Sequence, residues 1–198
     1  MFYDRVEVRE EPVTSPGTVA VGAFGVLEAA ALEHSTEVFG YRLVEPDGRR
    51  FVPELLSRFG ISGPSVSELD RAGSLRVGDL VVEVAEVSEP RRGQRFAFVM
   101  DTRLCDGVYA LADGADMLVI EATFLTEDED LAHRYGHLTA RQAASVAADC
   151  GVGTLVLTHF SQRYPDASAR YADEAAAVFS GDIVVAEDLM RVPVPARR

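Results

Sequence analysis

The sequence predicts a layered α/β protein. Six short apolar runs have the length and composition of strands, and helical segments separate several of them. The clearest succession runs from residue 117 to residue 159, where strand, helix and strand follow one another. At 198 residues, 47% of them apolar, the chain is long enough to form one domain with a hydrophobic core.

The expected strands are short runs rich in β-branched, aromatic and leucine residues. They are Thr18–Ala23, Leu80–Val87, Arg95–Met100, Met117–Ile120, Thr154–Leu157 and Ile183–Ala186.

The clearest helix signal follows His137. Thr139 and Gln142 have the spacing of a capping box, in which each side chain bonds the other residue's backbone N–H. Ala143, Val146, Ala147 and Cys150 then fall on one helical face, and Gly151 is suited to end the helix.

Residues 45–79 differ from the rest of the chain and predict a two-helix arm inserted between strands. Pro53 is suited to begin a short helix that Gly60 ends. After the break at Gly63 and Pro64, the spacing of Ser65 and Glu68 predicts a second capping box. An ordinary connecting loop with helical turns is the alternative that composition leaves open.

Charge and composition exclude several classes of protein. A net charge of −13 argues against a protein that coats nucleic acid through its overall field. The longest apolar stretch, residues 19–32, is too short and too interrupted for a membrane span. The charged N-terminus does not fit a secretory signal, so we expect a cytoplasmic protein. Cys105 and Cys150 are expected to be free thiols.

Three of the predicted strands end on residues that can bind metal or move protons. Asp101, Glu121 and His159 come at or just beyond the ends of apolar runs. Strand ends are where layered α/β folds gather their functional sites. A carboxylate at a strand end often only caps a turn, but three such ends together favour a site. Since imidazole is the commonest metal ligand, His34, Asp101 and His159 form a candidate partial metal shell.

Six segments resemble one known family. They are "LEHSTEVFGYRL" (32–43), "GISGPSV" (60–66), "EPRRGQRFAFVMDTR" (89–103), "ADMLVIEATF" (115–124), "HLTARQAA" (137–144) and "LVLTHFSQRY" (155–164). In this order and spacing they resemble the C-terminal portion of ribonuclease Z, the tRNA 3′-end-processing endonuclease of the metallo-β-lactamase superfamily. The resemblance implies an αββα sandwich, here incomplete at its N-terminal half, so that residues 1–198 form a single partial domain.

The resemblance also implies roles for individual residues. His34 corresponds to a ligand of the first zinc, Asp101 to the aspartate that bridges both zincs, and His159 to a ligand of the second. His137 matches the histidine suited to protonate the leaving 3′-oxygen of the RNA, and Glu121 is expected to orient it.

The resemblance further implies how substrate is held. Arg163 is a candidate phosphate contact. The arm over residues 45–79, with Gly63 and Pro64, resembles the flexible arm with which this family grips precursor tRNA, acting on the partner subunit of a homodimer. The intact form is expected to hold two Zn²⁺ ions per protomer.

The family's first metal motif, H-x-H-x-D-H, does not occur in the 198 residues. Each zinc would then keep two protein ligands where three or four are usual. We therefore expect weak or no zinc binding and no RNA hydrolysis by this chain alone, and apolar sheet faces left exposed. Two alternatives remain: another metallo-β-lactamase-fold phosphodiesterase, or a metal-free tRNA-binding or dimerisation module.

Overall fold

The computed structural model describes residues 10–197 and divides them into two compact units. The first comprises the described residues up to Glu45 together with Gln94–Arg197. The second is the segment Pro46–Gly93. Each is described here by itself.

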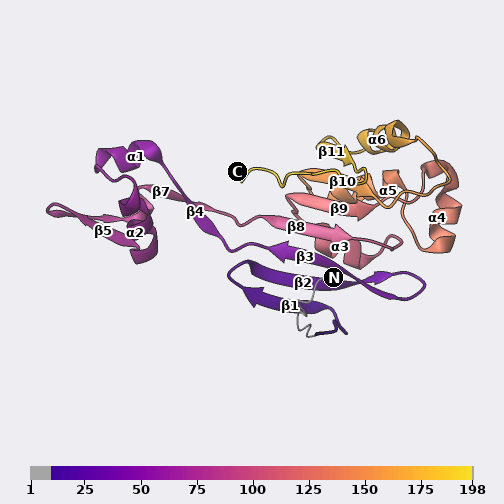
Figure 1. The fold of residues 1–198 in the computed structure, drawn as a ribbon, viewed down its shortest axis with the longest axis horizontal. Coiled ribbons are helices and arrows are strands. Elements are labelled where there is room, and N and C mark those ends of the chain that lie inside the picture. Colours follow the sequence, from indigo (N-terminus) through magenta and orange to yellow (C-terminus); the bar gives the residue numbers. More distant parts are fainter. Residues whose placement is uncertain (1–9, 198) are drawn as a thin grey trace, which may run out of the picture. The chain divides into compact units, whose positions relative to one another are not determined.

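The first unit is built on a seven-stranded mixed sheet (Figure 1). Its strands are β1 (Gly17–Gly22), β2 (Gly25–Glu33), β3 (Glu37–Val44), β8 (Arg95–Val99), β9 (Met117–Glu121), β10 (Thr154–Thr158) and β11 (Asp182–Val185), and this is also their order in the sheet. Neighbouring strands from β1 to β8 are antiparallel, whereas β8, β9, β10 and β11 are parallel. The parallel half confirms the α/β prediction.

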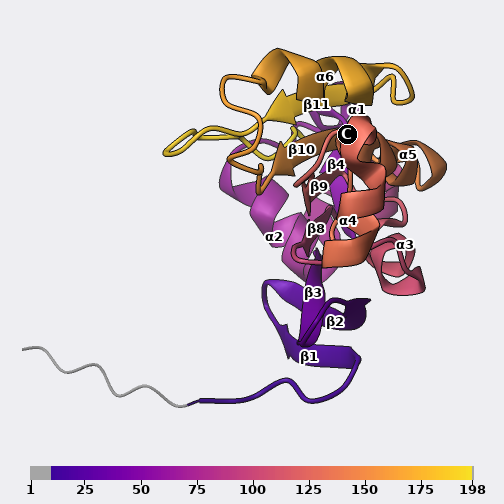
Figure 2. The same cartoon turned by 90° about the vertical axis from the view of Figure 1, so that its right-hand side faces the viewer.

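Helices connect the parallel strands and cover one face of the sheet. They are α3 (Asp106–Ala112), α4 (Glu129–Tyr135, after the 3-10 turn η2, Thr126–Asp128), α5 (Ala140–Asp149) and α6 (Ser168–Ala176). Figure 2 shows α3 and α5 on one side of the strands. The predicted capping box of α5 is present, since the Gln142 backbone N–H donates to Thr139 Oγ1 at 3.2 Å. Gly151 follows the helix with φ +62°, as a helix stop requires.

The two faces of the sheet differ in burial. On the covered face Ala97, Leu118 and Leu155, which are register partners, are 0% exposed and belong to the main core. On the opposite face Phe98 lies between Tyr41 and Val119 and is 44% exposed. The second face is therefore apolar yet open around Phe98.

A pair of truncations measures this difference. Leu118→Ala is expected to lower the free energy of unfolding by about 2–5 kcal/mol, because it leaves a cavity in the main core. Phe98→Ala removes a half-exposed ring and is expected to cost about 1 kcal/mol. Urea denaturation of both variants tests the assignment, and equal losses would show that the Phe98 face is covered in solution.

The second unit is a small fold with its own core. It contains β4 (Gly48–Phe51), α1 (Pro53–Arg58), α2 (Pro64–Ala72), β5 (Ser74–Val77), β6 (Leu80–Glu83), the 3-10 turn η1 (Val84–Glu86) and β7 (Ser88–Arg91). β4 pairs with β7 and β5 with β6, both antiparallel. Five buried side chains form its core: Leu56, Ile61, Leu69, Val82 and Val87.

Two local expectations within this unit are wrong. The capping box at Ser65 and Glu68 is absent, because α2 begins at Pro64, directly after Gly63 with φ +55°, without a side-chain cap. The strand expected over residues 80–87 ends at Glu83, where Glu83 and Glu86 form the capping box of η1.

Both cysteines are free and half-buried, as expected. Within residues 10–197, no helix has the length and apolarity needed to cross a bilayer.

Candidate metal centre

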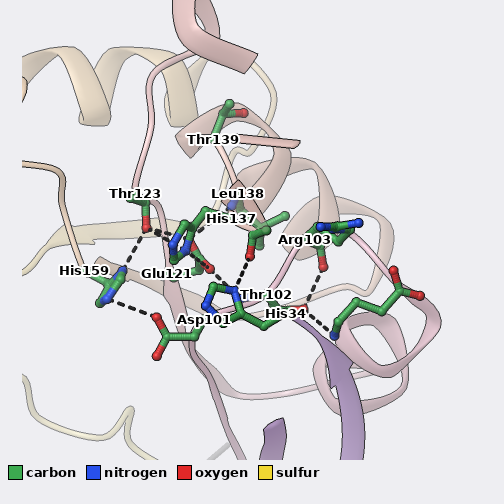
Figure 3. A network of polar contacts seen from close by, with 12 residues as sticks. His34, Asp101, Thr102, Arg103, Glu121, Thr123, His137, Leu138, Thr139 and His159 are labelled. Atoms are coloured by element: carbon green, nitrogen blue, oxygen red, sulfur yellow. Dashed lines mark hydrogen bonds and ion pairs between the residues drawn. The ribbon is translucent and has the colours of Figure 1, made fainter. Parts of the chain in front are cut away.

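The topology of the first unit gathers the predicted site residues at one edge of the sheet. Asp101, Glu121 and His159 lie at or just beyond the carboxyl ends of β8, β9 and β10, which are parallel neighbours. His34 opens the short turn between β2 and β3, and β3 runs antiparallel to β8, so this turn lies at the same edge. Figure 3 shows these side chains around one centre, with His137 from the segment before α5.

Two of the site residues have left-handed backbone conformations. Asp101 has φ +50° and lies two residues beyond β8, and His159 has φ +61° and directly follows β10. Aspartate and histidine tolerate this conformation better than most residues with a Cβ. Their side chains meet, with Asp101 Oδ1 3.2 Å from His159 Nε2.

His34 is held by the backbone that follows α4. Its Nδ1 lies 3.0 Å from the carbonyl oxygen of Gly136, which can only accept, so Nδ1 donates and Nε2 keeps its lone pair. Gly136 has φ +79°, and a Cβ there would lie 2.9 Å from His34 Nδ1. Glycine is therefore required at this position both by the backbone conformation and by the close approach of the ring.

His137 lies between the other two histidine rings. The ring centroids of His34 and His137 are 4.9 Å apart, and those of His137 and His159 are 5.4 Å apart. His137 Nδ1 is 2.9 Å from Glu121 Oε1, so this histidine also holds its proton on Nδ1 and leaves Nε2 free.

Glu121 is a fully buried carboxylate that accepts four hydrogen bonds. Oε1 accepts from the Thr102 backbone N–H at 2.6 Å and from His137 Nδ1 at 2.9 Å. Oε2 accepts from Thr123 Oγ1 at 2.7 Å and from the Leu138 backbone N–H at 3.0 Å. Four donors satisfy the charge that burial would otherwise penalise.

Two tyrosines support the loop that follows β9. Tyr171 donates to the Thr123 carbonyl oxygen at 3.2 Å. Burial raises the pKa of Tyr171 to about 12, which keeps this hydroxyl a neutral donor. Tyr164 donates to Asp128, and burial together with this hydrogen bond raises the pKa of Tyr164.

The donor set fits a metal ion. His34, Asp101 and His137 offer ligand atoms within 4.8 Å of one another, and so do Glu121, His137 and His159. His159 Nε2 lies 3.2 Å from Asp101 Oδ1, a separation at which both atoms can bind one positive charge. A metal ion would supply that charge, and imidazole nitrogens with a carboxylate are ligands that Zn²⁺ takes.

The other predicted residues are not members of this cluster. Arg163 Nε lies 3.8 Å from Asp128, and its side chain is 54% exposed. It lines an open pocket of about 380 Å³ together with Glu127, Tyr164 and Arg170, among others. Gly63 and Pro64 belong to the second unit, at the start of α2.

The Asp101 carboxylate is expected to dominate metal affinity. A complete zinc site is worth about 10–16 kcal/mol, so losing one of four ligands lowers affinity about a hundredfold or more. In a protein completed with the rest of the metal site, Asp101→Ala should therefore weaken zinc binding about a hundredfold or more, measured by competition with a chromophoric chelator. Asp173→Ala, an exposed change on α6, is the control. Unchanged zinc affinity in Asp101→Ala would place the metal elsewhere.

A family model agrees with this geometry. The model described as "Beta-lactamase superfamily domain" matches residues 61–160, half of the chain. The chain belongs to the beta-lactamase superfamily.

Relatives within this superfamily are named ribonuclease Z. Those of Nocardia farcinica and Salinispora arenicola are 61% and 57% identical to this chain, over all of its length. Ribonuclease Z of Chlamydia trachomatis serovar D is 33% identical over 98% of it. The chain spans 65%, 63% and 64% of the lengths of these three relatives. The resemblance to ribonuclease Z is confirmed.

Solved structures confirm the fold. The metallo-beta-lactamase fold protein YhfI from Bacillus subtilis superposes with a TM-score of 0.56 at 17% identity, covering 86% of this chain and 50% of that protein. Human tRNase Z, short form, superposes with a TM-score of 0.54 at 24% identity, covering 92% of this chain and 48% of that protein. The metallo-β-lactamase-like fold expected from the sequence is thus confirmed.

Three residues of the centre were not singled out from the sequence. Thr123 bonds both Glu121 and His159, Thr102 presents its backbone N–H to Glu121, and the Gly136 carbonyl holds His34. A hydroxyl two residues after a carboxylate, as in Glu121-Ala-Thr123, is a local signal for the first. The other two contacts depend on tertiary structure alone.

Proposed function

We propose that this chain forms part of a zinc-dependent endoribonuclease that removes the 3′ trailer of precursor tRNA. The observation that carries the proposal is the cluster of three histidines around Asp101, in which each Nδ1 lies within hydrogen-bond distance of an oxygen atom. The identity of 61% to a ribonuclease Z supports the choice of reaction.

Each predicted site residue has its own role in this proposal. His34, Asp101 and His159 would hold the metal, with His137 adjacent. Zinc bound there would polarise the scissile phosphate and lower the pKa of the attacking water. In the reactive form His137 would carry a second proton on Nε2 and donate it to the leaving 3′-oxygen, while Glu121 accepts the hydrogen bond from Nδ1–H and keeps the ring oriented. Arg163 would contact a phosphate further along the RNA.

The second unit is a candidate for tRNA binding. It carries seven arginines against eight acidic residues, so it is nearly neutral in a chain whose net charge is −13. Because its net charge is close to zero, the second unit would repel the phosphates of tRNA less than the rest of the chain does. By resemblance we also infer a homodimer in the intact form and a location in the cytoplasm.

The reaction is tested with a precursor tRNA that carries a 3′ trailer, in the presence of zinc. One sample contains this chain alone, in which we expect little or no cleavage. The other contains the chain fused to the segment of the Nocardia farcinica relative that lies outside the match, in which we expect cleavage after the discriminator base. No cleavage by the fusion would overturn the proposal.

A deletion of the second unit, which contains most of the predicted arm, distinguishes this reaction from that of a phosphodiesterase for small substrates. The Glu45 backbone N–H donates to the Gln94 carbonyl at 2.9 Å, so residues 46–93 can be replaced by a short turn. In the fusion, the deletion should abolish the gel shift of precursor tRNA and spare hydrolysis of bis(p-nitrophenyl) phosphate. Equal tRNA binding with and without the second unit would favour the small-substrate enzyme.

A further inference from the structure

Thr123 lies between a buried carboxylate and a histidine of the metal centre. Its hydroxyl oxygen is 2.7 Å from Glu121 Oε2 and 2.8 Å from His159 Nδ1 (Figure 3). The residue is 8% exposed, so water has little access to compete for these bonds. Both partners are therefore fixed through one hydroxyl.

The direction of each bond follows from counting hydrogens. A threonine hydroxyl has one hydrogen, and the Glu121 carboxylate, surrounded by donors, can only accept it. Thr123 must therefore accept from His159, which places the His159 proton on Nδ1. Its Nε2 is the ring nitrogen that faces Asp101, 3.2 Å from Oδ1.

His137 is hydrogen-bonded to the same carboxylate directly, with no hydroxyl between them. Its Nδ1 is 2.9 Å from Glu121 Oε1 and 3.4 Å from Thr123 Oγ1, so the shorter bond to Glu121 takes the proton. Glu121 Oε1 thus contacts His137 directly, and Glu121 Oε2 contacts His159 through the hydroxyl of Thr123.

We propose that Thr123 is a positioning residue that lets the single buried carboxylate of Glu121 set the tautomer and orientation of His159 together with those of His137. Without the hydroxyl, His159 Nδ1 loses its partner in the structure. Free imidazole side chains prefer the proton on Nε2, which would turn the metal-facing nitrogen of His159 into a donor. Losing such an outer contact typically weakens metal binding about 10–100-fold.

The test compares the metal-free wild-type chain with Thr123→Val and Thr123→Ser. Imidazole tautomers are assigned from long-range nitrogen–proton correlation spectra at a pH well above the ordinary histidine pKa of about 6.5. The chain has four histidines, so the spectrum is simple. His34, held by Gly136, reports on folding, and the exposed His133 of α4 reports on an unconstrained ring.

In the wild-type chain, His34, His137 and His159 should all show the Nδ1–H pattern. Thr123→Val should convert His159 toward the pattern of His133 and leave His34 and His137 unchanged, and Thr123→Ser should restore it. An Nε2–H pattern for His159 in the wild-type chain overturns the proposal, whether or not the valine variant folds. So does an unchanged His159 in a folded Thr123→Val chain.

Cobalt titration gives a second readout that needs no catalysis. In the fusion protein, Thr123→Val should bind Co²⁺ about 10–100-fold more weakly than the unsubstituted fusion, and Thr123→Ser should bind with nearly the unsubstituted affinity. The proposed role in metal binding rests on the proposed function, whereas the tautomer result does not. A failed tRNA cleavage assay with the expected tautomers would reject the reaction and leave the role of Thr123 standing.

Discussion

Replacing His137 with alanine is expected to slow cleavage of precursor tRNA by about 10²–10⁴-fold, the usual contribution of a general acid. The reason is geometric: Glu121 accepts a hydrogen bond from Nδ1, and the ring lies beside those of His34 and His159 in the candidate metal centre. The measurement is the single-turnover rate of the fusion protein at saturating zinc.

His133→Ala is the matched control, because this histidine lies on the exposed side of α4, outside the cluster. It should cleave at the wild-type rate. Zinc content must be measured alongside, since His137 also lies within ligand distance of both candidate groups. A His137→Ala protein that keeps its zinc and its full rate would show that another group protonates the leaving oxygen. Loss of zinc together with activity would make His137 a ligand.

Glu121→Ala is expected to lower the free energy of unfolding by about 4 kcal/mol or more. The substitution leaves four buried donors without their acceptor, and each unsatisfied group costs about 1–3 kcal/mol before the structure relaxes. Urea denaturation followed by circular dichroism measures the loss.

Two further variants make this result specific. Glu187→Ala removes an exposed carboxylate and should change the free energy of unfolding by no more than about 0.5 kcal/mol. Glu121→Gln keeps the volume but turns an NH₂ group toward two of the donors, so it should cost roughly half as much as alanine. If Glu121→Gln is as stable as the wild type, the buried group does not act as a carboxylate.

The parallel half of the sheet could be predicted because its strands are buried on the helix-covered face and are rich in valine, leucine and isoleucine. Met117–Glu121 and Thr154–Thr158 differ from the predicted runs by one residue at their ends. Gly25–Glu33 was not anticipated, since its sequence GVLEAAALE contains alanine and glutamate, which are uncommon in strands. Pairing with β1 on one side and β3 on the other overrides this preference.

The candidate site was predictable where it depends on strand ends. Asp101, Glu121 and His159 were singled out because parallel strands bring their carboxyl ends together, and the structure places them at one edge. The position of His34 depends on the antiparallel turn between β2 and β3, and neither of these strands is among those expected from the sequence. The contacts of Thr123 with His159 and of Gly136 with His34 join residues distant in sequence, and no local pattern encodes their distances.

The left-handed conformations of Asp101 and His159 have a consequence for evolution and design. Such a conformation costs a residue with a Cβ roughly 1 kcal/mol, a cost that glycine escapes. Glycine at either position would relax the backbone and remove a ligand in the same step. A search for thermostable variants that ignores activity should therefore drift toward glycine at these two positions, and selection for metal binding must work against that drift.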